Sequence, residues 1–180
     1  MSLFTASLVC GLALVGLGAP LLVDHAGIKA AIRAFPRSVS AGYAAFSVGA
    51  AWFLYNIWNL SKADFGEYRT ILFIGFAAVA VLAFKCVPDF LGVRGVCAIV
   101  LVGAAPLLNA AFMEYDRPQR LFMVGFVYVA LSLAIWLGAQ PWRLRDFLEW
   151  LFARPARSRG LGGVLVAYGV LLCGVAFTMR

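Results

Sequence analysis

The side chains best suited to bind a ligand are amides and aromatic rings in the second apolar run of the chain. Trp52, Asn56 and Asn59 are spaced i, i+4 and i+7, so a helix places them on one face. Tyr55 lies beside them, and Asn109 in a later run falls at a similar depth. An amide that faces lipid is unfavourable. We therefore expect these side chains to turn into a bundle and hydrogen-bond between helices, either to fix the packing or to bind a small polar ligand.

A charged turn near the middle of the chain is the second candidate site. Pro88 lacks an N–H and should end the preceding helix near Cys86. We expect Asp89 to cap the next helix and to pair with Lys85, Arg94 or both, since an acid between two bases lowers the cost of holding all three near hydrocarbon. The turn is then either a clamp between two halves of the chain or a site for an anionic headgroup or substrate, with Arg94 as a bidentate donor.

Small residues form a third pattern, which specifies contact rather than chemistry. Gly163, Ala167 and Gly174 share one stripe of the last apolar run, and Ala45 and Gly49 form a small-xxx-small pair in the second run. Such stripes let two helix backbones approach closely. We expect them to pack within the bundle or against a second copy of the chain.

The residue types that several enzyme classes require are scarce. One histidine, His25, cannot supply two axial haem ligands or a histidine metal cluster, and all eight acids fall in loops or at helix ends. We therefore predict no cofactor and no metal, and we disfavour hydrolases and pumps that use a buried acid. The cysteines are expected to be small buried hydrophobes, with a quinone-linked thiol relay as the alternative. They are Cys10, Cys86, Cys97 and Cys173.

The composition indicates that lipid surrounds most of the chain. Hydrophobic residues make up 64% of the 180 and charged residues 13%, whereas a soluble domain is about half apolar and about a quarter charged. The net charge of +7 is spread over loops, with no basic cluster interleaved with stacking aromatic residues. Nucleic acid is therefore not expected as a partner, and the basic loops predict contact with anionic lipid headgroups.

Six apolar runs are long enough to cross a bilayer as helices, because only helices satisfy their own backbone in hydrocarbon. They are residues 3–23, 41–60, 71–84, 95–113, 121–139 and 161–179. The third run reaches spanning length only if it begins near Tyr68 and includes Lys85. Two further segments, which end at Pro36 and Pro155, each have an apolar and a charged face. We therefore predict an all-α polytopic membrane protein, a single domain of six transmembrane helices with two cytoplasmic interfacial helices.

The distribution of basic residues sets the expected orientation. Ten of the fifteen fall in the loops after the first, third and fifth runs: Lys29, Arg33, Arg37, Lys85, Arg94, Arg143, Arg145, Arg154, Arg157 and Arg159. The positive-inside rule therefore places these loops in the cytoplasm and both termini outside it, which fits a bacterial inner membrane. Residues 19–22 and 105–108 share the letters Ala-Pro-Leu-Leu, so halves 1–88 and 89–180 could be inverted repeats.

These patterns favour a non-catalytic structural or accessory subunit of a membrane complex, which contacts a protein partner or a second copy of itself. Two alternatives remain. Inverted halves would suit a small-solute carrier or channel with a polar cavity near Pro20 or Pro106. The cysteines and the central turn would suit a lipid- or quinone-linked enzyme.

Overall fold

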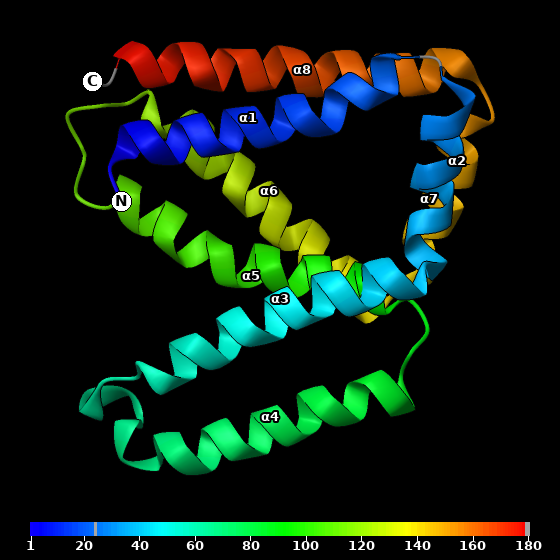
Figure 1. Ribbon diagram of the computed structural model, residues 1–180. Coiled ribbons are helices and arrows are strands. Elements are labelled where there is room, and N and C mark those ends of the chain that lie inside the picture. The colour runs from blue at the N-terminus through cyan, green and yellow to red at the C-terminus, as the bar shows by residue number, and fades with distance from the viewer. Residues whose placement is uncertain (24, 179–180) are drawn as a thin grey trace. The chain divides into compact units, whose positions relative to one another are not determined.

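The computed structural model describes residues 1–23 and 25–178, and these residues form only helices and loops (Figure 1). Within them the α-helices are α1 (Leu3–Leu22), α2 (Ala26–Ala34), α3 (Val39–Trp58), α4 (Arg69–Cys86), α5 (Leu91–Ala111), α6 (Arg120–Ala139), α7 (Trp142–Phe152) and α8 (Pro155–Thr178). Short 3-10 turns occupy Phe35–Arg37, Lys62–Asp64 and Gly66–Tyr68. The predicted all-α fold is confirmed.

Five helical segments are long and apolar enough to cross a membrane. They are Leu3–Leu22, Gly66–Cys86, Leu91–Ala111, Arg120–Ala139 and Pro155–Thr178. The third run does extend through Lys85, as its short apolar stretch required. Helix α3 has 20 residues but is not among the five, since its Trp, Tyr and Asn side chains lower its mean hydropathy. A sixth span stays a prediction.

Local sequence sets several helix ends. The hydroxyl of Ser2 accepts a hydrogen bond from the Thr5 N–H (3.2 Å), and Ser38 does the same for Ala41 (3.3 Å), so each serine caps the helix that follows. Helix α4 ends at Cys86 because Val87, which precedes a proline, adopts an extended φ of −137°. The predicted end of this helix is confirmed.

The chain divides into two compact units. Unit 1 comprises Met1–Arg33, Gly103–Leu133 and Arg145–Arg180, and unit 2 comprises Ala34–Val102 and Ala134–Leu144. Each unit draws on both halves of the sequence, so the units do not coincide with residues 1–88 and 89–180. The inverted repeat therefore stays a prediction.

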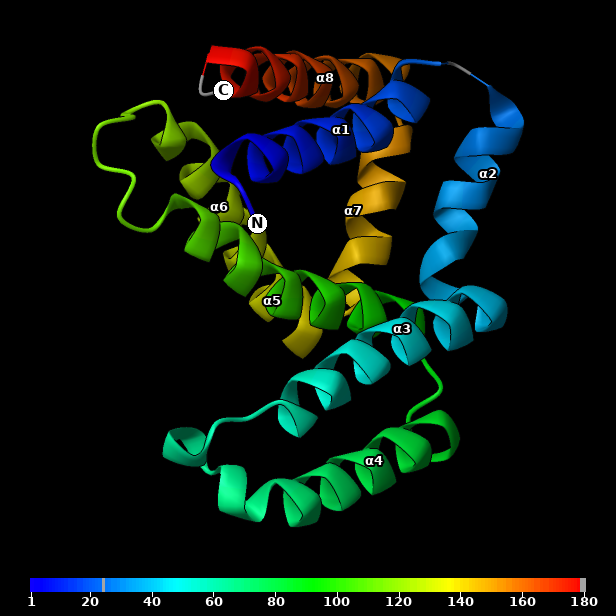
Figure 2. The same ribbon diagram turned by 60° about the vertical axis from the view of Figure 1, so that its left-hand side comes forward.

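Unit 1 is built on the antiparallel pair α1 and α8, which lie side by side in both views (Figures 1 and 2). A Cβ atom placed on Gly11 would lie 2.7 Å from the Gly169 carbonyl oxygen, and one on Gly18 would lie 2.8 Å from that of Gly162. The two glycines on each helix are seven residues apart, so both pairs meet when the helices run antiparallel. Only glycine allows the backbones to approach this closely.

The stripe predicted on α8 does not make this contact. A Cβ atom on Gly163 or Gly174 would meet nothing within 4 Å, and Ala167 is exposed. Of the two contacts expected for these residues, packing within unit 1 is not seen, because the neighbouring stripe of Gly162 and Gly169 matches the glycine spacing of α1. Their contact with a second copy remains a prediction.

Unit 2 is built on α3, which packs against the first half of α5. A Cβ atom on Gly49 would lie 3.0 Å from the Gly95 carbonyl oxygen, and one on Gly95 would overlap the Phe46 backbone nitrogen. The predicted close approach at Ala45 and Gly49 is therefore confirmed. Helix α4 pairs with α3 through aromatic rings, among them Phe84 against Tyr43 (5.1 Å between centroids).

Candidate functional site

The side-chain amides of α3 donate hydrogen bonds to backbone carbonyls of their own helix. The Asn56 side chain donates to the Trp52 carbonyl (2.9 Å) and that of Asn59 donates to the Tyr55 carbonyl (2.7 Å). All four side chains are exposed, with 37% of Trp52 and 66% of Tyr55 accessible. The predicted interhelical bonds of Asn56 are wrong, because an amide near a helix end can reach the carbonyl four residues earlier.

Replacing Asn56 by leucine should therefore change the free energy of unfolding by less than about 0.5 kcal/mol, as expected for an exposed site. The bond that is lost joins the amide to its own helix, and no partner on another helix is left unpaired. Unfolding of the purified chain in detergent, followed by circular dichroism, measures the effect. A loss of more than about 1 kcal/mol would restore the interhelical interpretation.

The central turn does not hold the predicted ion pairs. Lys85 and Asp89 are exposed and Arg94 is half-buried, and among the described residues Asp89 forms no ion pair with either base. The structure described also has no bond from an α5 N–H to the Asp89 carboxylate. Phe90 has a left-handed φ of 57°, so the chain turns after Asp89 and α5 begins beyond it. The ion-pair clamp and the cap are wrong, and the headgroup site is still a prediction.

The cysteines divide by burial. Cys10 and Cys97 are buried at 2% and 6% exposure, as predicted for small hydrophobes. Cys173 is half-buried, and Cys86 at the end of α4 is exposed. Cys86 therefore departs from the expected burial and provides a natural position for a thiol label.

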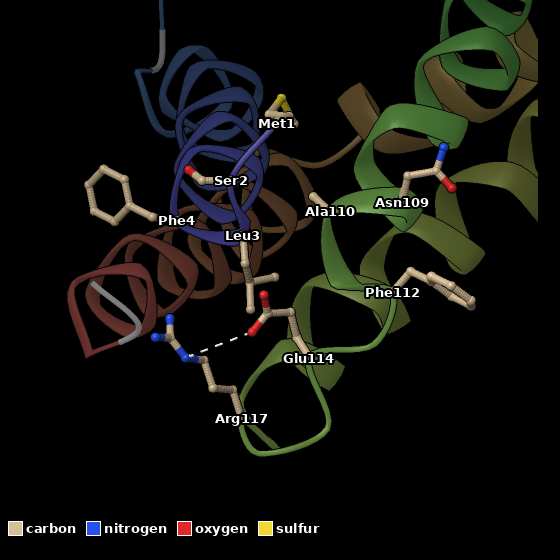
Figure 3. Close-up of a pocket in the computed structure, with 9 residues that line it drawn as sticks. All are labelled: Met1, Ser2, Leu3, Phe4, Asn109, Ala110, Phe112, Glu114 and Arg117. Atoms are coloured by element: carbon tan, nitrogen blue, oxygen red, sulfur yellow. Dashed lines mark ion pairs between the residues drawn. The ribbon is translucent and has the colours of Figure 1, made fainter.

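A groove with charged lining residues lies in unit 1, where α5 ends and the loop to α6 begins. It has a volume of about 480 Å³. Its lining residues are Met1, Ser2, Leu3, Phe4, Asn109, Ala110, Phe112, Glu114 and Arg117. Glu114 and Arg117 turn toward each other, while Asn109 and Phe112 point away from this pair (Figure 3). A second groove of about 310 Å³ adjoins it and shares Asn109 and Phe112.

The charged groups of the first groove are exposed and loosely paired. The Arg117 Nε lies 4.0 Å from a Glu114 carboxylate oxygen, with 42% and 47% of the two side chains accessible. An exposed pair of this kind contributes only about 0–1 kcal/mol to stability. The two side chains can bind a small polar group by hydrogen bonds.

Arg120 contacts both the end of α5 and the loop beside the second groove. Its guanidinium donates to the Ala111 carbonyl at the end of α5 (2.7 Å) and lies 4.6 Å from the centre of the Tyr115 ring. Met113, between these contacts, has a left-handed φ of 67°. The guanidinium therefore replaces the backbone donor that the last turn of α5 lacks.

Substituting Arg120 with glutamine should lower the free energy of unfolding by about 1.5–3 kcal/mol, the usual contribution of a hydrogen bond to a charged group. The Ala111 carbonyl would lose its donor and the Tyr115 ring its cation. Urea unfolding of the detergent-solubilised chain tests this. Gln119→Ala in the same loop is the matched control, since Gln119 is exposed. Equal stability of the two variants would show that the Arg120 contacts do not hold the loop.

Sequence reasoning found part of this region. Asn109 was expected to point into the bundle beside Asn56, but it is exposed and lines both grooves of unit 1, whereas Asn56 belongs to unit 2. Glu114, Arg117 and Arg120 were missed as site residues. The available signal was the density of charge in residues 114–120, directly after an apolar run that ends near an amide. Neither groove includes Pro20 or Pro106, where a carrier cavity was expected.

No protein-family model, curated protein or solved structure matches this chain.

Proposed function

We propose that this chain is an integral membrane protein with six transmembrane helices, in which α2 and α7 lie at the cytoplasmic surface. Five spans are supported by their length and apolar composition. The sixth, α3, is supported by its packing, since Gly42 and Gly49 lie against α5 around Gly92 and Gly95. A helix held this closely to a spanning helix for two turns shares its environment.

We further propose that the chain serves as a structural or accessory subunit of a membrane complex. The observation that carries this role is α4, in which none of the 18 residues is buried. Its outer face includes Ile71, Val79 and Val81, which are 62–72% accessible, and Gly75 beside them has open space at its Cβ position. This apolar surface with a glycine notch suits the close approach of a helix from another subunit.

The role is tested with a photoreactive amino acid placed at Val79, in cells that produce the chain at its native level. We expect a protein adduct at Val79 and none at Phe73, whose ring packs against Trp58 (5.4 Å). The same protein should co-purify in a fixed ratio and be lost when Gly75 is replaced by leucine, which fills the notch. Adducts with lipid alone would contradict the subunit role.

The orientation gives a separate prediction. A cysteine at Ser61 should react with a membrane-impermeant maleimide from outside the cell, and one at Ala153 should react only after the membrane is opened. Ser158, in the same basic segment, is buried and is less suitable than the exposed Ala153. Cys86 should behave like Ala153, and its replacement by serine removes the background. The opposite labelling pattern would reverse the proposed topology.

A further inference from the structure

Helix α7 exposes two aromatic rings beside its packed face. Leu148 and Leu151 are buried in unit 1, whereas 42% of Phe147 and 53% of Trp150 remain accessible. The two exposed rings are stacked, with centroids 6.0 Å apart and an interplanar angle of 28°. Exposed Phe and Trp rings on an amphipathic helix are typical of a helix at the boundary between lipid headgroups and acyl chains.

An arginine extends this stack. The Arg157 guanidinium, from the first turn of α8, lies 4.4 Å from the centre of the Trp150 ring. Its Nη1 also donates to the Trp150 carbonyl (2.9 Å). A guanidinium has five N–H donors, so most of its fork stays available while the ring and the carbonyl fix its plane. The stack of Phe147, Trp150 and Arg157 therefore combines an apolar surface with an oriented guanidinium that can donate hydrogen bonds to an anion.

The charges around the stack favour an anion. Residues 145–159 carry four bases, namely Arg145, Arg154, Arg157 and Arg159, against the two acids Asp146 and Glu149. Arg145 engages both acids, at 2.6 Å and 3.9 Å. In the described part of the chain neither acid forms an ion pair with Arg154 or Arg157. The positive charge at the stack is thus not neutralised by α7 itself.

A second arginine–aromatic contact links α2 to α7. The Arg33 guanidinium lies 5.3 Å from the centre of the Phe152 ring, which α7 turns toward the interior of unit 1. This contact holds basic groups of α2 beside those of α7. Basic groups near exposed aromatic rings suit the surface of a membrane that contains anionic lipid.

We propose that Phe147, Trp150 and Arg157 form a binding site for an anionic phospholipid, in which Arg157 donates to the phosphate and the two rings lie against the upper acyl chain. A free phosphate would have no use for the exposed rings, which is why we assign a lipid. The inference deepens the proposed function, since it rests on α7 lying at the membrane surface.

The site is tested on the full chain in detergent by titration with dioleoyl phosphatidylglycerol or dioleoyl phosphatidylcholine, with bound lipid counted by native mass spectrometry. Arg157→Gln should weaken phosphatidylglycerol binding about fivefold, the effect of one basic residue near an anionic surface. Trp150→Leu should weaken the binding of both lipids, because leucine lacks the indole ring that stacks with Phe147 and Arg157. Arg145→Gln is the matched control on α7 and should weaken binding less than Arg157→Gln, since Arg145 is paired with Asp146 and Glu149 and does not contact the rings.

Three results would overturn the site. They are unchanged phosphatidylglycerol binding in Arg157→Gln, an equal loss in Arg145→Gln, and displacement of the lipid by inorganic phosphate at the same concentration. If Arg157→Gln does not fold, Arg157→Lys decides, because it keeps the charge and loses the planar fork. That variant should bind phosphatidylglycerol more weakly than the native chain, and full binding would reject the proposed geometry. Lipid binding is measured in detergent and does not depend on the orientation of the chain in the membrane. If labelling shows a reversed topology but the lipid selectivity is as expected, only the proposed orientation is overturned.

Discussion

Replacing Gly169 by alanine is expected to lower the free energy of unfolding by about 1–3 kcal/mol, the usual range for overpacking a close contact. The added methyl group would lie 2.7 Å from the Gly11 carbonyl oxygen and 3.0 Å from the Val15 backbone nitrogen. Two backbone atoms cannot rotate away as a side chain can. Helices α1 and α8 would therefore have to separate along the whole interface.

The matched control is Gly163→Ala on the same helix. Its new methyl group would meet nothing within 4 Å, and alanine is the better helix former by roughly 1 kcal/mol. This variant should be as stable as the native chain or slightly more so. Thermal or urea unfolding in detergent, followed by circular dichroism, compares the two. If Gly163→Ala destabilised the chain as much as Gly169→Ala, the predicted stripe would be a real contact, with a second copy as its partner.

The packing faces of α8 show where sequence reasoning stops. The small residues of α8 predicted a close helix contact, because glycine and alanine positions can be read directly from the sequence. The choice between the stripe of Gly163 and that of Gly162 depends on the partner helix. The seven-residue spacing of Gly11 and Gly18 matches Gly162 and Gly169, and this match could have been read from the sequence.

The candidate sites differ from their predictions for local reasons. The end of α4 was predictable, because a proline restricts the residue before it whatever lies around it. The role of Asp89 was not, because one left-handed residue, Phe90, moves the helix start beyond it. Asn56 was expected to hydrogen-bond to another helix. The sequence does not distinguish an asparagine that does so from one that donates to a carbonyl of its own helix. The groove at Glu114 depends on chain segments more than 100 residues apart, which no local pattern brings together.

The second large effect is expected in unit 2, where Gly95→Ala should lower the free energy of unfolding by about 1–3 kcal/mol or more. A Cβ atom there would overlap the Phe46 nitrogen and lie 2.5 Å from the Ala45 carbonyl carbon. Gly92, one turn earlier, has its nearest neighbour at 3.4 Å, an ordinary contact distance. Gly92→Ala should therefore leave the free energy of unfolding almost unchanged. The two variants then compare a tight and an ordinary contact on the same helix.

The same comparison tests whether α3 belongs with the spanning helices. If α3 is held by α5, loss of the Gly95 contact should free it, and a cysteine at Ala45 should become reactive to maleimide in detergent. Gly75→Ala on α4 is the control in the purified chain, since its Cβ position is open. It should change neither stability nor reactivity. Equal effects of Gly92→Ala and Gly95→Ala would mean that helix propensity, and not the backbone contact with α3, sets the stability of this unit.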